Sequence, residues 1–173
     1  FREWPYLYDG DAEYEAGYLA TFANHPDGVI VAARDGDTIV GAATAAPLAG
    51  HTDEFVPLFE SHGYDPEAIF YCGESVLLPD YRGQGIGHAF FDQREAHARA
   101  LNTRGYRFTH ATFCGVVRAD DDPRKPADYR PLDDFWRKRG YETVPGLIGH
   151  YDWREIGHAE ETRKVMQFWI KAL

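Results

Sequence analysis

The residues with the clearest capacity for chemistry lie in the segment Ser75–Gly87, which reads SVLLPDYRGQGIG. Here an apolar strand is expected to run into a glycine-rich turn that opens a helix. Gly83, Gly85 and Gly87 leave their backbone N–H groups uncovered by Cβ atoms, at the positive end of that helix. Such groups can bind phosphate oxygens together, and Arg82 adds a cation that stays charged at any working pH.

The spacing of these glycines excludes two common phosphate-binding motifs. The dinucleotide pattern G-x-G-x-x-G needs a third glycine where this chain has His88. A P-loop needs a Gly-Lys-Ser/Thr sequence, and none follows the turn. What remains is the pattern R-x-x-G-x-G after a strand that ends in Val-Leu-Leu-Pro.

Glu74 is the single carboxylate in the apolar stretch Ala68–Leu78, AIFYCGESVLL. An ionised side chain in an apolar strand is costly unless it is paired or functional. Two interpretations are open. Glu74 is either a general base or anchor for a substrate amine, or a carboxylate tied to a neighbouring arginine or backbone N–H group.

Cysteine and metal chemistry have weaker support. His110 and Cys114 lie four residues apart on one expected strand, roughly 13 Å along it, so a direct hydrogen bond is not expected. Cys72 and Cys114 both lie in apolar runs, which predicts reduced thiols in a cytoplasmic protein. The eight histidines have no metal-ligand spacing, so no metal is predicted.

The elements that must position these residues follow an α/β order. Helices are expected at Asp11–Ala23, Ile86–Leu101 and Leu132–Arg139. Strands are expected at Val29–Arg34, Thr38–Ala45, Ala68–Leu78, Tyr106–Val117, Leu147–Trp153 and Val165–Lys171. The strand, helix and strand around the turn imply a crossover and a parallel pair. The apolar face of the middle helix is expected to comprise Ile86, Ala89, Phe90, Ala96 and Ala100.

Composition limits the classes of protein to consider. A chain of 173 residues that is 44% apolar and 15% aromatic can bury the core of one domain. Its 18 Lys and Arg against 28 Asp and Glu give a net charge of −10, which argues against nucleic acid as a partner. No apolar run approaches the roughly 20 residues that span a bilayer, so no membrane partner is expected.

The segment Pro79–Leu101 resembles the pyrophosphate-binding turn and helix of the GNAT superfamily, the acetyl-CoA-dependent N-acyltransferases. The resemblance covers most of the chain. Val29–Ala45 is similar to the family's second and third strands, Ala68–Leu78 to its fourth and Tyr106–Val117 to its fifth. Residues 135–141, Phe-Trp-Arg-Lys-Arg-Gly-Tyr, are similar to its late helix.

This resemblance implies a fold and its boundaries. Residues 1–173 would form a single domain with a mixed, mostly antiparallel sheet, splayed at a central parallel pair and flanked by helices. The family's first strand and first helix would precede Phe1. Dimers are common in the family, so a homodimer is a possible assembly.

The resemblance also implies an activity. The chain would transfer an acetyl group from acetyl-CoA to a primary amine of a small molecule or peptide, by direct attack in a ternary complex. The pantetheine arm would lie along Val76, Leu77 and Leu78. The pyrophosphate would be held by the turn residues Arg82, Gly83, Gln84, Gly85, Ile86, Gly87 and His88. The alternatives are an acyl-CoA-binding sensor without catalysis and a nucleotide-binding domain that uses the same turn.

The expected acid and base are less well defined. In several family members the residue that acts as the base aligns with Tyr71 of this chain rather than with Glu74. A β-bulge at the splay would change the face of the sheet from which the Glu74 side chain projects. The family's usual acid, a tyrosine of the late helix, is replaced by Trp136, whose indole is not a practical proton donor. Tyr129 and Tyr141 are the candidate substitutes.

Two further segments could shape the acceptor site. The connection Pro47–Glu67 is acidic and long enough to be a lid, and a solvated loop is the favoured alternative. The aromatic residues Trp4, Tyr6 and Tyr8 could line the acceptor pocket or hold the start of the chain against the core.

Overall fold

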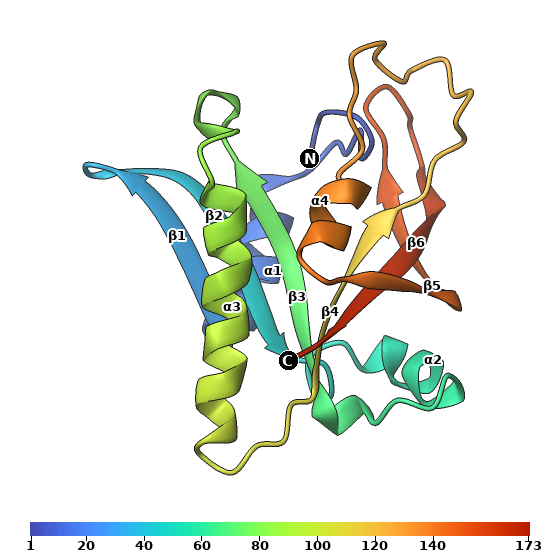
Figure 1. The fold of residues 1–173 in the computed structure, drawn as a ribbon. Coiled ribbons are helices and arrows are strands. Elements are labelled where there is room, and N and C mark those ends of the chain that lie inside the picture. The colour runs from blue at the N-terminus through green and yellow to red at the C-terminus, as the bar shows by residue number, and fades with distance from the viewer.

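A computed structural model describes residues 1–173 as one six-stranded sheet with helices against it (Figure 1). The strands are β1 (Val29–Asp35), β2 (Thr38–Pro47), β3 (Ile69–Leu77), β4 (His110–Val116), β5 (Glu142–Arg154) and β6 (Glu161–Ala172). Their order in the sheet is β1-β2-β3-β4-β6-β5. Only β3 and β4 are parallel, which confirms the predicted mixed, mostly antiparallel sheet.

The helices are α1 (Ala12–Ala23), α2 (Val56–Ser61), α3 (Ile86–Asn102) and α4 (Asp133–Lys138). Asp11 caps α1, because its carboxylate accepts hydrogen bonds from the amides of Glu13 and Tyr14. Three short 3₁₀ segments, Asp53–Phe55, Pro66–Ala68 and Pro79–Tyr81, lie in the connections. No helix has the length and apolar character needed to cross a membrane.

The parallel pair opens after a short contact. β3 and β4 are paired at three positions only, from Ile69 opposite His110 to Tyr71 opposite Thr112. Beyond these positions β3 stays on β2 and β4 stays on β6, and the two strands diverge toward the turn before α3 (Figure 1). The predicted splay is therefore confirmed, and the edge of β3 that faces β4 has no strand partner after Tyr71.

Two apolar clusters hold the sheet. One contains α3 residues such as Phe91 and Leu101 together with Phe113 and Trp169. The other joins Phe22 of α1 and residues of the 47–67 connection to the sheet. Aromatic rings dominate both clusters, and this accounts for much of the 15% aromatic content.

The predicted apolar face of α3 is confirmed at Phe90, is partly buried at Ile86 and is wrong at its three alanines. The structure buries Phe90, Phe91, Arg94, Glu95, Ala98 and Leu101. Ala89, Ala96 and Ala100 are exposed. A face chosen for apolar residues alone omits Arg94 and Glu95, which are buried because both find polar partners inside the protein.

The 47–67 connection does not cover the splay. Phe55 and Phe59 are buried, and α2 contacts β5 at the end of the sheet away from the turn before α3 (Figure 1). The segment contributes no residue to the large cleft described below. The structure therefore does not support the lid, the less favoured of the two interpretations, because two phenylalanines anchor the segment to the core.

Candidate active site

The glycine turn presents unusually open backbone. Gly83 has φ of 75° and Gly85, the N-cap of α3, has φ of 84°. An added Cβ would meet no atom within 4 Å at either position, so the turn faces open space. Glycine is favoured at both residues because of the left-handed backbone rather than crowding.

The amides of the turn are free. None of the N–H groups of residues 83–88 donates a hydrogen bond to a backbone carbonyl, and no side chain caps α3. The first amide to do so is that of Ala89, which bonds to the Gly85 carbonyl at 3.1 Å. Six consecutive donors at the positive end of a 17-residue helix form a site for an anion with several oxygens.

The side chains of the turn have partners of their own. Arg82 forms an exposed ion pair with Glu3 at 2.9 Å. Gln84 donates to the Asp80 carbonyl at 3.0 Å. The Nδ1 atom of His88 lies 3.2 Å from the Arg139 guanidinium. Backbone groups, rather than these side chains, are therefore the free donors of the turn.

A cleft of about 2500 Å³ joins this turn to the splay. Its lining includes the glycines of the turn and Val76, Leu77 and Leu78, the residues predicted to face a pantetheine arm. It also includes Glu74 and a set of aromatic residues, namely Trp4, Tyr6, Tyr8, Tyr14, Tyr18, Tyr71, Tyr129, Tyr151 and Trp153. The structure thus places the predicted phosphate site and the predicted carboxylate on one continuous cleft.

Glu74 is the carboxylate of the cleft with the most altered pKa. Burial first, and the charge of Glu15 of α1 second, raise its pKa to about 7. Tyr6, Tyr8 and Tyr18 line the same cleft, and burial raises the pKa of each above its ordinary value. The Glu74 carboxylate forms no ion pair within 4 Å, so the interpretation of a paired structural carboxylate is not supported.

A β-bulge sets the position of Glu74. Gly73 and Glu74 together oppose the single residue Thr44, since the pairing passes from Ala43 with Ser75 to Ala45 with Cys72. A Cβ on Gly73 would lie 2.5 Å from Phe22 and 2.6 Å from the Thr44 hydroxyl. Only glycine fits this position, and the bulge foreseen at the splay is present.

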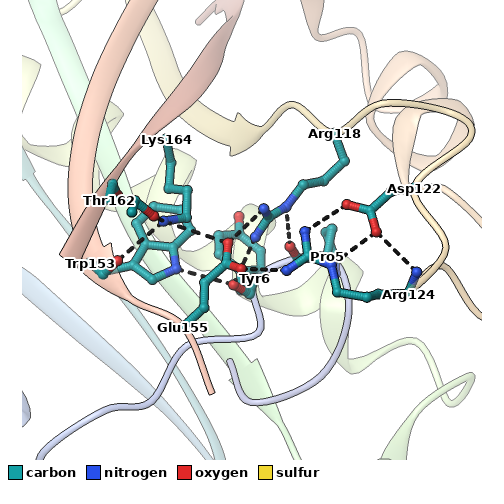
Figure 2. Close-up of polar contacts among 9 residues, drawn as sticks. All are labelled: Pro5, Tyr6, Arg118, Asp122, Arg124, Trp153, Glu155, Thr162 and Lys164. Atoms are coloured by element: carbon teal, nitrogen blue, oxygen red, sulfur yellow. Dashed lines mark hydrogen bonds and ion pairs between the residues drawn. The ribbon is translucent and has the colours of Figure 1, made fainter. Parts of the chain in front are cut away.

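An ionic cluster around the buried Glu155 carboxylate holds the segment that contains Tyr6 (Figure 2). The Glu155 carboxylate lies 2.6 Å from Arg118, 2.5 Å from Arg124 and 3.5 Å from Lys164. Arg118 also donates to the carbonyls of Pro5 and Tyr6, and the Trp153 indole donates to the Tyr6 carbonyl at 3.1 Å. Sequence reasoning missed this cluster, because its members come from three segments far apart in the chain.

The candidate acids differ in position. Tyr129 lines the cleft with its ring 6.2 Å from that of Trp4, and burial raises its pKa. Tyr141 is fully buried, donates to Glu95 at 3.2 Å and lies outside the cleft. The Trp136 ring packs against Phe113 and Trp169. Only Tyr129, of the two predicted substitutes, is therefore placed with Glu74.

The remaining candidates are structural. Tyr71 is buried with its hydroxyl 3.4 Å from that of Tyr151 and 3.9 Å from the Cys114 sulfur. Burial raises the pKa of Tyr71, which does not suit a base. His110 interacts with Thr109 rather than with Cys114, and Cys72 and Cys114 are free thiols.

Comparison with known proteins agrees with this geometry. The profile described as Acetyltransferase (GNAT) family matches residues 1–121, and the chain belongs to the GNAT acetyltransferase family. A search of curated proteins by sequence finds no match.

Solved structures share the fold at low identity. An aminoglycoside 6'-N-acetyltransferase complexed with coenzyme A is 20% identical with a TM-score of 0.57, over 98% of this chain and 83% of that one. An IAA acetyltransferase from Bacillus cereus ATCC 14579 is 11% identical with a TM-score of 0.56, over 97% and 89%. A GNAT family acetyltransferase from Elizabethkingia anophelis with acetyl-CoA bound is 14% identical with a TM-score of 0.53, over 97% and 87%.

Proposed function

We propose that this protein transfers an acetyl group from acetyl-CoA to a primary amine of a small molecule or peptide. The observation that carries the proposal is the row of six free amides in the turn and first residues of α3, on the same cleft as Glu74. The pyrophosphate of acetyl-CoA binds the N–H groups of residues 83–88, with Arg82 beside them. The pantetheine arm pairs with the open edge of β3 at Val76, Leu77 and Leu78.

Glu74 acts as the general base. An alkyl amine with a pKa of roughly 10.4 is mostly protonated at neutral pH, so it must lose a proton before it attacks. A carboxylate with a pKa of about 7 accepts that proton near neutral pH more effectively than an ordinary glutamate. The two structures with CoA species bound support acetyl-CoA as the acetyl donor.

The amine attacks the thioester carbon directly. A bond forms from nitrogen to this carbon, the carbon–sulfur bond breaks, and the electron pair leaves with the sulfur of CoA. Glu74 holds the proton that the ammonium group loses before attack and passes it to solvent. After attack the nitrogen loses a second proton, which restores the one that Tyr129 gives to the departing sulfur. A covalent cysteine intermediate is disfavoured, because burial raises the pKa of Cys114 to about 12 and no histidine pairs with it.

A thiol-release assay tests the proposal. The protein is incubated with acetyl-CoA and each of four amines: spermidine, tyramine, kanamycin and an alanine-initiated peptide. We expect release of free thiol that depends on at least one amine and falls in Glu74→Gln. Binding of acetyl-CoA in calorimetry without amine-dependent release would instead support the acyl-CoA sensor. ATP that displaces acetyl-CoA at equal concentration would support the nucleotide-binding domain.

A further inference from the structure

The bulge on β3 leaves main-chain groups that the sheet does not satisfy. Because Gly73 and Glu74 share one partner residue, the regular ladder between β2 and β3 is interrupted at Thr44. Buried backbone donors and acceptors need other partners when a ladder is interrupted. Glu74 is one of these residues. The groups that form hydrogen bonds with its main-chain N–H and C=O therefore also fix the point from which its side chain projects.

Two buried side chains form hydrogen bonds with these main-chain groups. The Glu74 amide donates to the Thr44 hydroxyl at 2.9 Å. Arg94 Nη1 donates to the Thr44 carbonyl at 3.3 Å and to the Glu74 carbonyl at 3.4 Å. Both side chains belong to residues that are 1% exposed. We refer to Thr44 and Arg94 as the bulge pair.

Arg94 is otherwise difficult to explain. It lies on the buried face of α3 between Phe90 and Ala98, where helical spacing calls for an apolar side chain. No carboxylate forms an ion pair with it, and its Nη2 atom has no hydrogen-bond partner. Its charge is compensated in part by neutral groups, because Nε donates to the Phe90 carbonyl at 3.2 Å and the guanidinium lies 4.6 Å from the centre of the Phe91 ring.

The neighbouring residue shows the contrast. Glu95 is also buried, and it pairs with Lys171 at 2.8 Å, Arg139 at 3.4 Å and Arg99 at 3.5 Å. A buried charge with such partners is balanced, whereas the charge of Arg94 is not. A buried cation without an anion destabilises a protein. Stability alone therefore does not account for Arg94.

We propose that Arg94, together with Thr44, is a positioning residue that locks the β-bulge so that the Glu74 side chain points into the cleft. This inference rests on the proposed function for the role of Glu74 as base. The geometric part of the inference, that Arg94 holds Glu74 in place, is independent of it. Arg94 acts through the main chain, and it is not assigned a contact with substrate.

The test is a titration of Glu74 by ¹³C NMR of side-chain carboxyls, with the signal assigned by its loss in Glu74→Gln. Arg94→Met keeps the length and removes the donors, and Thr44→Val keeps the shape and removes the hydroxyl. We expect both variants to lower the Glu74 pKa by at least about one unit, because a released side chain reaches water. Arg99→Met, on the exposed side of α3, should leave the titration unchanged.

The direction of the shift decides between explanations. Loss of a nearby cation alone would raise the pKa of a carboxylate. A raised or unchanged Glu74 pKa in both Arg94→Met and Thr44→Val would therefore overturn the inference. If Arg94→Met does not fold, as judged by circular dichroism, Thr44→Val decides alone, because it leaves the arginine in place.

Kinetics give a second measurement in the thiol-release assay. We expect Arg94→Met to lower kcat about tenfold with the KM for acetyl-CoA within twofold of wild type, and to add less than twofold in a Glu74→Gln background. A raised KM for acetyl-CoA with unchanged kcat would show that Arg94 contacts the carrier and would overturn the inference. A wild-type protein without amine-dependent release would refute the proposed function, while the NMR titration would still test the bulge pair.

Discussion

Arg118 lies 2.6 Å from the buried carboxylate of Glu155 and also donates to the Tyr6 carbonyl at 3.0 Å (Figure 2). One guanidinium thus joins the end of β5 to the segment that precedes α1. Tyr6 lines the cleft together with Glu74. The ion pair therefore helps to fix the wall of the cleft beside the proposed base.

Removing the carboxylate of this cluster should lower the free energy of unfolding. Glu155→Gln leaves Arg118 and the 5% exposed Lys164 without their shared counter-charge. Breaking a buried pair from one side costs about 3 kcal/mol or more, which urea unfolding at pH 7 would detect. Asp152→Asn is the matched control, because its pair with Arg163 is exposed and should contribute below about 1 kcal/mol. Equal losses in the two variants would contradict this prediction.

The pH dependence of the rate should follow Glu74. Since burial first, and Glu15 second, raise its pKa to about 7, kcat/KM should rise with pH through that value as the base loses its proton. Glu74→Gln should lower kcat about 100-fold and remove this limb of the profile. Glu15→Gln should keep the limb and move its midpoint to lower pH, because a like charge is removed. A midpoint unmoved in Glu15→Gln would argue against their proximity.

The same shift makes Glu74 a source of instability. Its folded pKa lies above the ordinary value of 4.5, so the folded state holds a proton that the unfolded chain releases more readily. The destabilisation is absent below about pH 4.5, grows as pH rises and is complete above about pH 7. The Tm of Glu74→Gln should therefore exceed that of wild type at pH 8 and approach it at pH 5. Scanning calorimetry at both values would show a constant difference if Glu74 were not perturbed.

Local signals predicted the parts of the site that depend on neighbours in sequence. The strand, turn and helix from β3 to α3 follow from an apolar run and three glycines, and Asp11 marks the start of α1. The burial of Glu95 could not be predicted in this way, because Lys171, 76 residues later, supplies one of its cations. The position of Tyr141 likewise depends on Glu95, 46 residues away. Ion pairs and hydrogen bonds between residues far apart in the sequence leave no periodic pattern, so local signals do not predict them.

Substitutions in the glycine turn should weaken acetyl-CoA binding without unfolding the protein. Gly85 has φ of 84°, a backbone conformation in which alanine is strained. In Gly85→Ala the backbone shifts to relieve this strain, and the free amides no longer point in one direction. Loss of one or two amide contacts corresponds to about tenfold weaker binding, measurable by calorimetry. Gly36→Ala is the control, since it carries a similar strain at φ of 56° in the β1–β2 turn. Equal affinity for acetyl-CoA in the two variants would show that the turn is not part of the binding site.

Replacing the two candidate tyrosines should separate a role in the cleft from a role in the core. Tyr129→Phe should lower kcat, by no more than about tenfold, because the thiolate of CoA leaves readily even without a proton donor. Tyr141→Phe should leave kcat unchanged and cost about 1 kcal/mol of stability, since it removes only the bond to Glu95 inside the core. Steady-state rates and urea unfolding on both variants provide the comparison. A fall in kcat confined to Tyr141→Phe would mean that the protein opens during turnover to a form in which Tyr141 reaches the cleft.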